Sequence, residues 1–501
     1  MPDWRMWWEL NKDTFLVDDS WRAPEFPRAP GAYQVAGEEP TPWAPPEAAV
    51  AFLRAQAEDS DTRVARSALV ALGKLGLPAD MDLLSRAVRQ GPIPLRQGAA
   101  FALGLHGSPE ALAKLRESAG DASTPAQVRE AAVLALGCGN PKDGDSVELL
   151  AGLLPDRSAT PSLRTCAAMS LGALGARGDL LGETLQDRGA PVSCRTACAL
   201  ALGLQAMDSD RRRETPDLVA LYRQQSDPQF RRSLALAAGP LLDPQQSDAF
   251  ASILRSELDT LTKAYGMISL AASGSRGAMD TLCRNLEDPS QTPMQTGLRP
   301  FCSLGLAAAG RAENFESIRT ALNRSRDATE RTGHALALSL LRKADAPTLD
   351  PLLAERAYPV LQGIISIGAV VSLAEPGAQK VRGTIDTQGR SPEMLRSGVL
   401  GLGSQRDGQD LDRFYAGLSD PDRYARGAAV LALGWSGRAE VVDGLLSRAG
   451  ASGASATLRE GACAALGALL SPERTRRIRR FSRLVEPTHL LPAALALLET
   501  I

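Results

Sequence analysis

The chain has 501 residues, of which 44% are hydrophobic and only 4% aromatic, and its formal net charge is −2. The balanced charge excludes a general attraction to nucleic acid or to an anionic membrane. The low aromatic content disfavours a β-sandwich, whose strands are rich in branched and aromatic side chains. No apolar run is long enough to span a bilayer, so no transmembrane helix is predicted.

Residues 1–46 form an aromatic, Pro-rich segment that we expect to act as a strap or end cap. Trp4, Trp7 and Trp8 stand at helical spacing, and many prolines between residues 17 and 46 exclude a regular helix there. The tryptophans either anchor a partner protein or cover the open core edge of the first repeat, and we favour the second interpretation. The start of the chain lacks the pattern of a signal peptide, so a cytoplasmic location is expected.

Residues 47–470 contain a repeat whose clearest copy is Arg129–Gly137, REAAVLALG. It returns about every 33 residues, which gives about thirteen copies. Each copy reads as an amphipathic helix, a turn and a second helix rich in small residues, ending near an anchor glycine. Anchors are Gly73, Gly104, Gly137, Gly172, Gly203, Gly239, Gly274, Gly310, Gly368, Gly403, Gly434 and Gly467, with Ser339 in the same place in one copy. The anchor either ends the helix in a left-handed conformation or permits close helix contact.

A repeated helix that cannot bury its own face predicts an all-α solenoid of stacked hairpins, that is, an α/α superhelix. Two connections, Asp208–Glu214 and Pro376–Ser391, are polar and irregular, and we interpret them as inserted surface loops.

Residues 471–501 are predicted to be the C-terminal end cap. The segment carries a cluster of arginines, namely Arg474, Arg476, Arg477, Arg479, Arg480 and Arg483. This cluster either prevents end-to-end stacking of solenoids, which we favour, or binds a polyanion such as nucleic acid, an acidic protein or a membrane surface.

The repeat resembles HEAT-like repeats of the short variety named after phycobilin lyases. This resemblance covers residues 47–470 and implies a right-handed superhelix, with the second helices on the concave side and protein binding as the usual role. The opening stretch MWWELNKDTFL also resembles a WWEFNKD-type segment that precedes HEAT-like repeats in some bacterial proteins.

An arginine stands eight residues before the anchor in most copies. The set is Arg96, Arg129, Arg164, Arg195, Arg231, Arg331, Arg426 and Arg459, with Arg66 and Arg396 one residue later. Such a ladder could bind a polyanion. We favour a structural role, in which the guanidinium group bonds carbonyl groups or an Asp of a nearby turn.

A second stripe combines a residue seven before the anchor with a residue three before it. Its candidate protein-binding members are Gln97, Phe101, Glu130, Leu134, Thr165 and Met169, and Trp435 is a further aromatic residue of the second helices. Residues four apart share one side of a helix. The stripe is either a mildly apolar groove on the concave surface or part of the core.

No catalytic constellation is recognisable. The three histidines, His106, His334 and His489, lack nearby carboxylate or cysteine partners, and the His-Glu pairs of HEAT-like iron hydroxylases are absent. The seven cysteines are expected to be reduced, buried thiols. We therefore predict a non-catalytic scaffold that binds another protein, without cofactor or metal. Nucleic-acid binding is the alternative, and a bilin-lyase-like or other HEAT-repeat enzyme is a third, less favoured one.

Overall fold

The structure, a computed structural model, describes residues 45–208, 217–287, 297–310, 314–354, 359–387, 392–406 and 408–471. The tryptophans Trp4, Trp7 and Trp8 and the whole arginine cluster from Arg474 to Arg483 lie outside these residues. No helix in the described part is long and apolar enough to cross a membrane.

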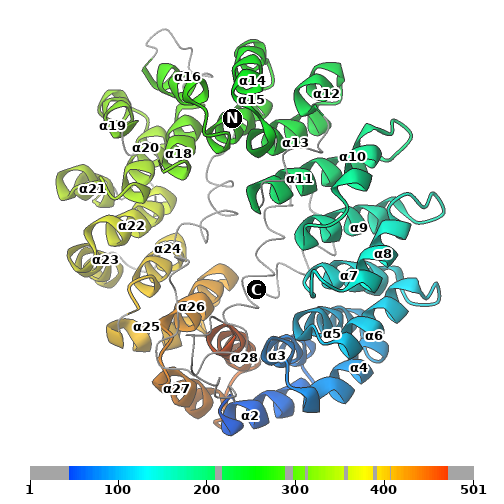
Figure 1. Cartoon of the computed structure of the whole chain (residues 1–501). Coiled ribbons are helices and arrows are strands. Elements are labelled where there is room, and N and C mark those ends of the chain that lie inside the picture. Colours follow the sequence, from blue (N-terminus) through cyan, green and yellow to red (C-terminus); the bar gives the residue numbers. More distant parts are fainter. Residues whose placement is uncertain are drawn as a thin grey trace, which may run out of the picture.

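The described residues form 26 α-helices, which pair into thirteen hairpins. In each hairpin the first helix lies on the outside of the molecule and the second on the inside (Figure 1). The outer helices are α2 (Glu47–Ala57), α4 (Met81–Arg89), α6 (Pro109–Gly120), α8 (Gly144–Leu153), α10 (Gly178–Gln186), α12 (Leu218–Gln224), α14 (Pro244–Ser256), α16 (Arg276–Glu287), α19 (Phe315–Arg324), α21 (Ala346–Leu353), α23 (Glu375–Thr387), α25 (Leu411–Gly417) and α27 (Glu440–Ala449).

The inner helices are α3 (Thr62–Leu75), α5 (Ile93–His106), α7 (Ala126–Gly137), α9 (Pro161–Leu174), α11 (Val192–Asp208), α13 (Pro228–Ala238), α15 (Thr260–Ala272), α18 (Arg299–Ala308), α20 (Ala328–Leu340), α22 (Pro359–Leu373), α24 (Pro392–Gly403), α26 (Arg423–Ser436) and α28 (Ala456–Leu470). Short 3-10 turns occur at Pro78–Asp80, Gly239–Leu241 and Gly408–Asp410. The predicted all-α solenoid of thirteen hairpins is confirmed. The stretch Pro376–Ser391 is not a loop as predicted, because most of it belongs to α23.

Many inner helices begin at a side chain that accepts a backbone hydrogen bond. Asp227 accepts from the N–H of Phe230, with Pro228 at the first helical position, where no N–H is needed. Thr160 and Ser455 begin α9 and α28 in the same way. These residues fix where each hairpin turns from its outer to its inner helix.

The anchor glycines permit unusually close packing between neighbouring inner helices. A Cβ atom on Gly73 would lie 2.3 Å from the carbonyl oxygen of Ala102, and one on Gly104 would lie 2.3 Å from that of Ala135. No real side chain tolerates such distances, so glycine is required for contact and not for backbone conformation. At Gly274 the other predicted role applies, because its φ is +66°.

The solenoid closes on itself. The last inner helix, α28, packs against the first, α3, and α2 packs against α27, so that the hairpins form a ring (Figure 1). The Oγ of Ser67 donates a hydrogen bond to the carbonyl oxygen of Glu460 at 3.1 Å. Arg459 forms an ion pair with Asp59 at 3.0 Å.

The closing junction repeats the contact seen inside the ring. A Cβ atom on Gly467 would lie 3.0 Å from the Cα of Ala71, two residues before the anchor Gly73. Ala102 and Ala135 hold the same place relative to Gly104 and Gly137. The first and last described hairpins therefore cover each other's core edges, whereas the sequence led us to expect open edges in need of end caps.

In a closed ring the last inner helix packs against a neighbour just as the others do. A larger side chain at the last anchor glycine should therefore destabilise the fold as much as a larger side chain at an anchor inside the ring. We expect Gly467→Val and Gly104→Val each to lower the free energy of unfolding by about 2 kcal/mol or more, since both overfill a helix contact. Gly152→Val is the matched control, because a Cβ atom at Gly152 in α8 would meet nothing within 4 Å. Urea unfolding measures all three. If Gly467→Val unfolded at the same urea concentration as wild type, the two ends of the array would not pack together.

Candidate protein-binding surface

Each inner helix has two sides that contact the neighbouring inner helices, as α5 illustrates. A Cβ atom on Gly104 would meet Ala135 of α7. On the opposite flank, a Cβ atom on Gly98 would lie 2.4 Å from the Cγ of Arg66 on α3. These contacts orient α5 about its own axis.

A third side of α5 faces the outer helices. The Nε of Arg96 donates a hydrogen bond to the carbonyl oxygen of Val88, which belongs to α4, at 3.0 Å. Successive residues of an α-helix are rotated by about 100°, and this rotation places Phe101 and Leu105 on the side opposite Arg96. Phe101 and Leu105 therefore face the inside of the ring.

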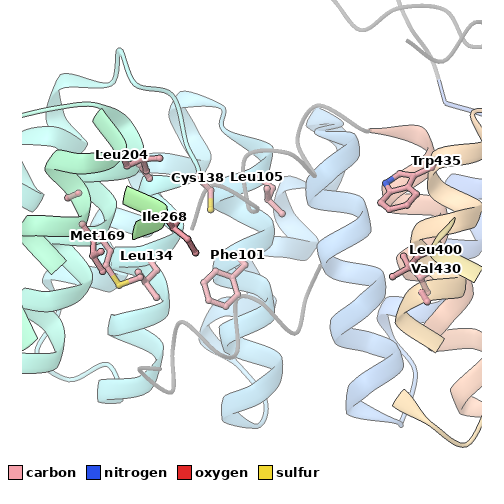
Figure 2. Packing of buried hydrophobic residues seen from close by; sticks show 14 of the residues in the cluster. Phe101, Leu105, Leu134, Cys138, Met169, Leu204, Ile268, Leu400, Val430 and Trp435 are labelled. Atoms are coloured by element: carbon pink, nitrogen blue, oxygen red, sulfur yellow. The ribbon is translucent and has the colours of Figure 1, made fainter. Parts of the chain in front are cut away.

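The same positions, three residues before and one residue after the anchor, form a row around the inside of the ring, which we call the inner row. Its members on α3, α5, α7, α9 and α11 are Val70, Lys74, Phe101, Leu105, Leu134, Cys138, Met169, Ala173, Leu200 and Leu204. Figure 2 shows members of this row on both sides of the closing junction, including Phe101, Leu134 and, on α26, Trp435. On these five helices the row is apolar except for Lys74.

The burial of the inner row bears on whether the predicted stripe is a binding groove or part of the core. Phe101 and Leu134 have no exposed surface, Met169 is 3% exposed and Trp435 is 5% exposed. These side chains lie on the concave side of the inner helices, as the groove hypothesis requires, yet they are buried. In this structure they therefore expose little surface to a binding partner.

The polar members of the predicted stripe connect neighbouring inner helices. The side-chain amide of Gln97 donates to the backbone carbonyl of Gln127 at 3.3 Å. The hydroxyl of Thr165 donates to the carbonyl of Pro161 at 2.7 Å and lies 3.2 Å from that of Ser193. Glu130 is half-buried. The sequence hypothesis missed the second half of the inner row, Lys74, Leu105, Cys138 and Leu204, although these residues follow the first half at a spacing of four.

The arginine ladder has the structural role that the spacing favours. In four hairpins the Nε atom donates to a carbonyl at the end of the preceding outer helix: Arg96 to Val88 at 3.0 Å, Arg129 to Ala119 at 3.2 Å, Arg164 to Leu154 at 2.8 Å and Arg195 to Leu185 at 2.9 Å. Arg426 bonds the carbonyl of Asp420 at 2.7 Å. The guanidinium groups of Arg96, Arg129, Arg164 and Arg195 thus satisfy carbonyls that the end of the outer helix leaves without an intrahelical partner, and place positive charge there.

Residues 83–160, from the second hairpin to the fourth, match the family model of HEAT repeats. Helical hairpins continue around the rest of the described ring. HEAT repeats are thus matched over residues 83–160, and the other described hairpins are similar to these in architecture. No curated protein matches it.

Two solved structures similar to this chain are human deoxyhypusine hydroxylase in complex with glycerol and an engineered protein. The hydroxylase is 20% identical, with a TM-score of 0.24, and the match covers 52% of this chain and 96% of the hydroxylase. The engineered protein is 14% identical, with a TM-score of 0.26, and the match covers 86% and 99% of the two chains. Similarity at this level carries no argument about function.

The described core of the ring contains a Ser-His contact that resembles a catalytic pair in composition. Ser303 on α18 and His334 on α20 lie 2.7 Å apart, Oγ to Nδ1, and neither has exposed surface. Burial, together with the nearby charge of Arg299, lowers the pKa of His334 to about 3. A substrate cannot reach this pair, which instead bridges two inner helices.

Within the described ranges, no group of three or more His, Cys, Asp or Glu side chains is arranged to hold a metal ion. A polar network joins α12 and α13 to the end of α14, where Glu257 accepts hydrogen bonds from Tyr222 and Arg231. Burial and the neighbouring carboxylate raise the pKa of Tyr222. Tyr222 and Glu257 are both buried, so this network stabilises the junction between hairpins.

Removal of one ladder arginine should cost stability because a buried carbonyl loses its charged donor. We expect Arg164→Ala to lower the free energy of unfolding by about 2 kcal/mol. Arg157→Ala is the control, since Arg157 is 78% exposed and pairs with Asp187 only at 3.7 Å, and exposed pairs contribute about 1 kcal/mol or less. Equal effects of the two substitutions in urea unfolding would contradict the structural role of the ladder.

His334 should make the wild-type protein less stable in acid. The unfolded chain takes up a proton on this histidine below pH 6.5, whereas the folded protein does so only near pH 3. The stability of the folded state therefore falls as the pH decreases through this interval, by about 1.4 kcal/mol per pH unit.

The variant His334→Gln has no side chain at this position that takes up a proton in this pH range. Relative to their difference at pH 8, wild type should lose about 3 kcal/mol more than the variant by pH 4.5. Thermal unfolding monitored by circular dichroism at both pH values measures the difference. A constant difference between the two proteins would show that His334 titrates normally in the folded state.

Proposed function

We propose that this ring is a non-catalytic scaffold that binds an apolar segment of another protein along the inner row. The observation that carries the proposal is the continuity of that row. Large apolar side chains such as Phe101, Leu134, Met169 and Leu200 follow one another on consecutive inner helices. These side chains are buried in the described structure, so an extended or helical polypeptide that crosses several hairpins contacts one of them on each helix only when the inner row becomes accessible.

The architecture suits this role because the row is held by rigid contacts. The anchor glycines permit the close approach of neighbouring inner helices, and in four hairpins a ladder arginine attaches the inner helix to its outer helix. A surface built on rigid elements loses little conformational entropy when it binds a partner. HEAT-like repeats in general form such extended concave surfaces.

The alternative of polyanion binding receives less support. The ladder arginines Arg96, Arg129, Arg164, Arg195 and Arg426 each use hydrogen-bond donors on backbone carbonyls. Arg164 and Arg195 are 5% and 6% exposed, so they offer little charge to a phosphate backbone. We retain the cluster from Arg474 to Arg483 as a proposed site for polyanion binding. An absence of salt-dependent binding to nucleic acid would remove it.

Photocrosslinking in the native cells tests the scaffold proposal. The full-length protein carries p-benzoylphenylalanine in place of Phe101 on the inner row, or in place of Tyr424 as the control. Tyr424 lies at the start of α26 and is 50% exposed. We expect a discrete adduct with another protein from position 101 and none of that mass from position 424.

The crosslinked segment of the adduct at position 101, identified by mass spectrometry, should be rich in apolar residues. A synthetic peptide of that segment should then bind the purified ring. Adducts only at position 424, or an identified peptide that does not bind, would overturn the proposal.

A further inference from the structure

The junction between the last and the first described hairpin differs from the other junctions in one physical respect. Within the described part of the chain, every other pair of neighbouring hairpins is consecutive in sequence, so the polypeptide itself joins the two. Only non-covalent contacts hold α28 against α3 and α27 against α2. If these contacts separate, the ring becomes an open array and the thirteen hairpins keep their internal structure.

The helix contact at this closing junction is also wider than at other anchor glycines. A Cβ atom on Gly467 would lie 3.0 Å from the nearest atom of α3. At five other anchors that contact the next inner helix, the corresponding distance is shorter: 2.3 Å at Gly73 and Gly104, 2.9 Å at Gly203, and 2.6 Å at Gly403 and Gly434. Helices in a less tight contact lose less dispersion energy when they separate.

The ion pair of the closing junction has a close equivalent inside the ring. Arg459 stands eight residues before its anchor and pairs with Asp59, two residues before the N-cap of α3. Arg231 stands eight residues before its anchor and pairs with Glu257, two residues before the N-cap of α15. In both places the acidic side chain also accepts a hydrogen bond from the backbone N–H two residues later, at 2.8 Å.

The internal pair belongs to a larger polar network than the closing pair. Glu257 also accepts a hydrogen bond from Tyr222, and the guanidinium group of Arg231 lies 4.7 Å from the centre of the Tyr222 ring. Across the closing junction, the described residues form one ion pair and one side-chain hydrogen bond. The closing junction therefore combines fewer polar contacts, a wider helix contact and no covalent connection.

We propose that the ring opens between α28 and α3, and that this opening is the gate through which an apolar segment of a partner protein reaches the inner row. The inference rests on the proposed function, because the gate serves the surface that would bind the partner. A closed ring admits a polypeptide only by one of its ends. A segment in the middle of a longer chain, between folded parts, needs an opening in the ring.

Opening also provides access to side chains that are buried in the closed ring. While the ring is closed, the rotations between neighbouring hairpins must sum to one full turn. After opening, this condition no longer holds, and each junction relaxes to its own preferred angle. Side chains such as Phe101 and Leu134, which have no exposed surface in the closed ring, then separate from their neighbours.

Two native cysteines report on the opening. Cys463 on α28 and Cys166 on α9 both have no exposed surface. Burial raises the pKa of Cys463, and the carboxylate of Asp59 in the first hairpin adds to this effect. Burial likewise raises the pKa of Cys166, with a contribution from Glu130 on α7. One thiol therefore lies near the closing junction, and the other lies near an internal junction in a similar environment.

The rate of N-ethylmaleimide labelling at each cysteine is measured on purified full-length protein by peptide mass spectrometry. Opening of the gate exposes Cys463, whereas global unfolding exposes Cys463 and Cys166 alike. Opening one junction costs less free energy than unfolding the whole ring, so we expect Cys463 to react at least about tenfold faster than Cys166. Equal rates at the two cysteines overturn the proposal.

A matched pair of variants tests the closing ion pair. Asp59→Asn removes the charge and keeps an oxygen that accepts the backbone hydrogen bond, and Glu257→Gln makes the same change at the internal pair. We expect Asp59→Asn to raise the labelling rate of Cys463 relative to that of Cys166 by about fivefold. Glu257→Gln should leave this ratio unchanged. If the two variants change the ratio equally, the closing junction is not the gate.

A distance measurement separates opening of the ring from fraying of α28 alone. Spin labels on Ala55→Cys in α2 and Ser447→Cys in α27, both exposed positions, report across the outer side of the closing junction. The labels are attached first, in a Cys283→Ser background because Cys283 is partly exposed. N-ethylmaleimide then modifies Cys463, and the bulky adduct prevents the ring from closing again.

Pulsed electron–electron double resonance should show that the distance between the two labels increases by about 10 Å or more, the separation of two packed helices. Labels on Arg89→Cys in α4 and Glu117→Cys in α6, exposed positions of two consecutive hairpins, provide the control and should keep their distance. An unchanged distance between α2 and α27 overturns the proposal, because α28 then frays while the ring stays closed.

The purified protein contains no partner, so these measurements judge the opening independently of the scaffold function. In the native cells, Asp59→Asn should raise the yield of the photocrosslinked adduct at position 101, and Glu257→Gln should not. An unchanged yield in a ring that opens faster overturns the role of the opening as the partner's entrance. Absence of an adduct from every variant contradicts the scaffold function itself, and with it the gate as an entrance for partners.

Discussion

The close contact between neighbouring inner helices is the constraint on which the rest of this structure depends. At Gly73, Gly104 and Gly434 the helix of one hairpin approaches the next so closely that a single methyl group would clash. Such contacts fix the distance between hairpins and the small rotation from each to the next. In an open solenoid the sum of these rotations gives a superhelix with two exposed ends. Here the sum brings Gly467 against Ala71, and the last contact has the same form as the first.

Closure changes what the ends of the repeat array need. A terminal repeat of an open array exposes a core edge and must be capped. In the ring, α28 and α3 cover each other, and the pairs Ser67–Glu460 and Arg459–Asp59 bridge the junction. Segments beyond the array are then not required to close the core.

The arginine ladder shows how one repeated residue can suggest a binding site and serve the fold. Seen in the sequence, regularly spaced guanidinium groups along a groove resemble a polyanion surface. In the structure, the Nε atoms of Arg96, Arg129, Arg164 and Arg195 point outward to the ends of the outer helices. The same contact orients each inner helix, and so directs Phe101 and its equivalents toward the inside. The arginine ladder thus orients the residues of the candidate site but does not belong to that site.

The sequence by itself determined the hairpins, their number, the small residues at helix contacts and the structural use of the arginines, because these depend on neighbours within one or two repeats. It also identified Phe101, Leu134 and Met169 as one stripe, since a spacing of four places residues on one side of a helix. Only the tertiary structure decided which way the stripe faces, how deeply it is buried, and that Gly467 meets Ala71. Those properties depend on a rotation summed over thirteen hairpins and on contacts between residues nearly 400 positions apart, such as Ser67 and Glu460 with a separation of 393. No local pattern of residues encodes such a sum.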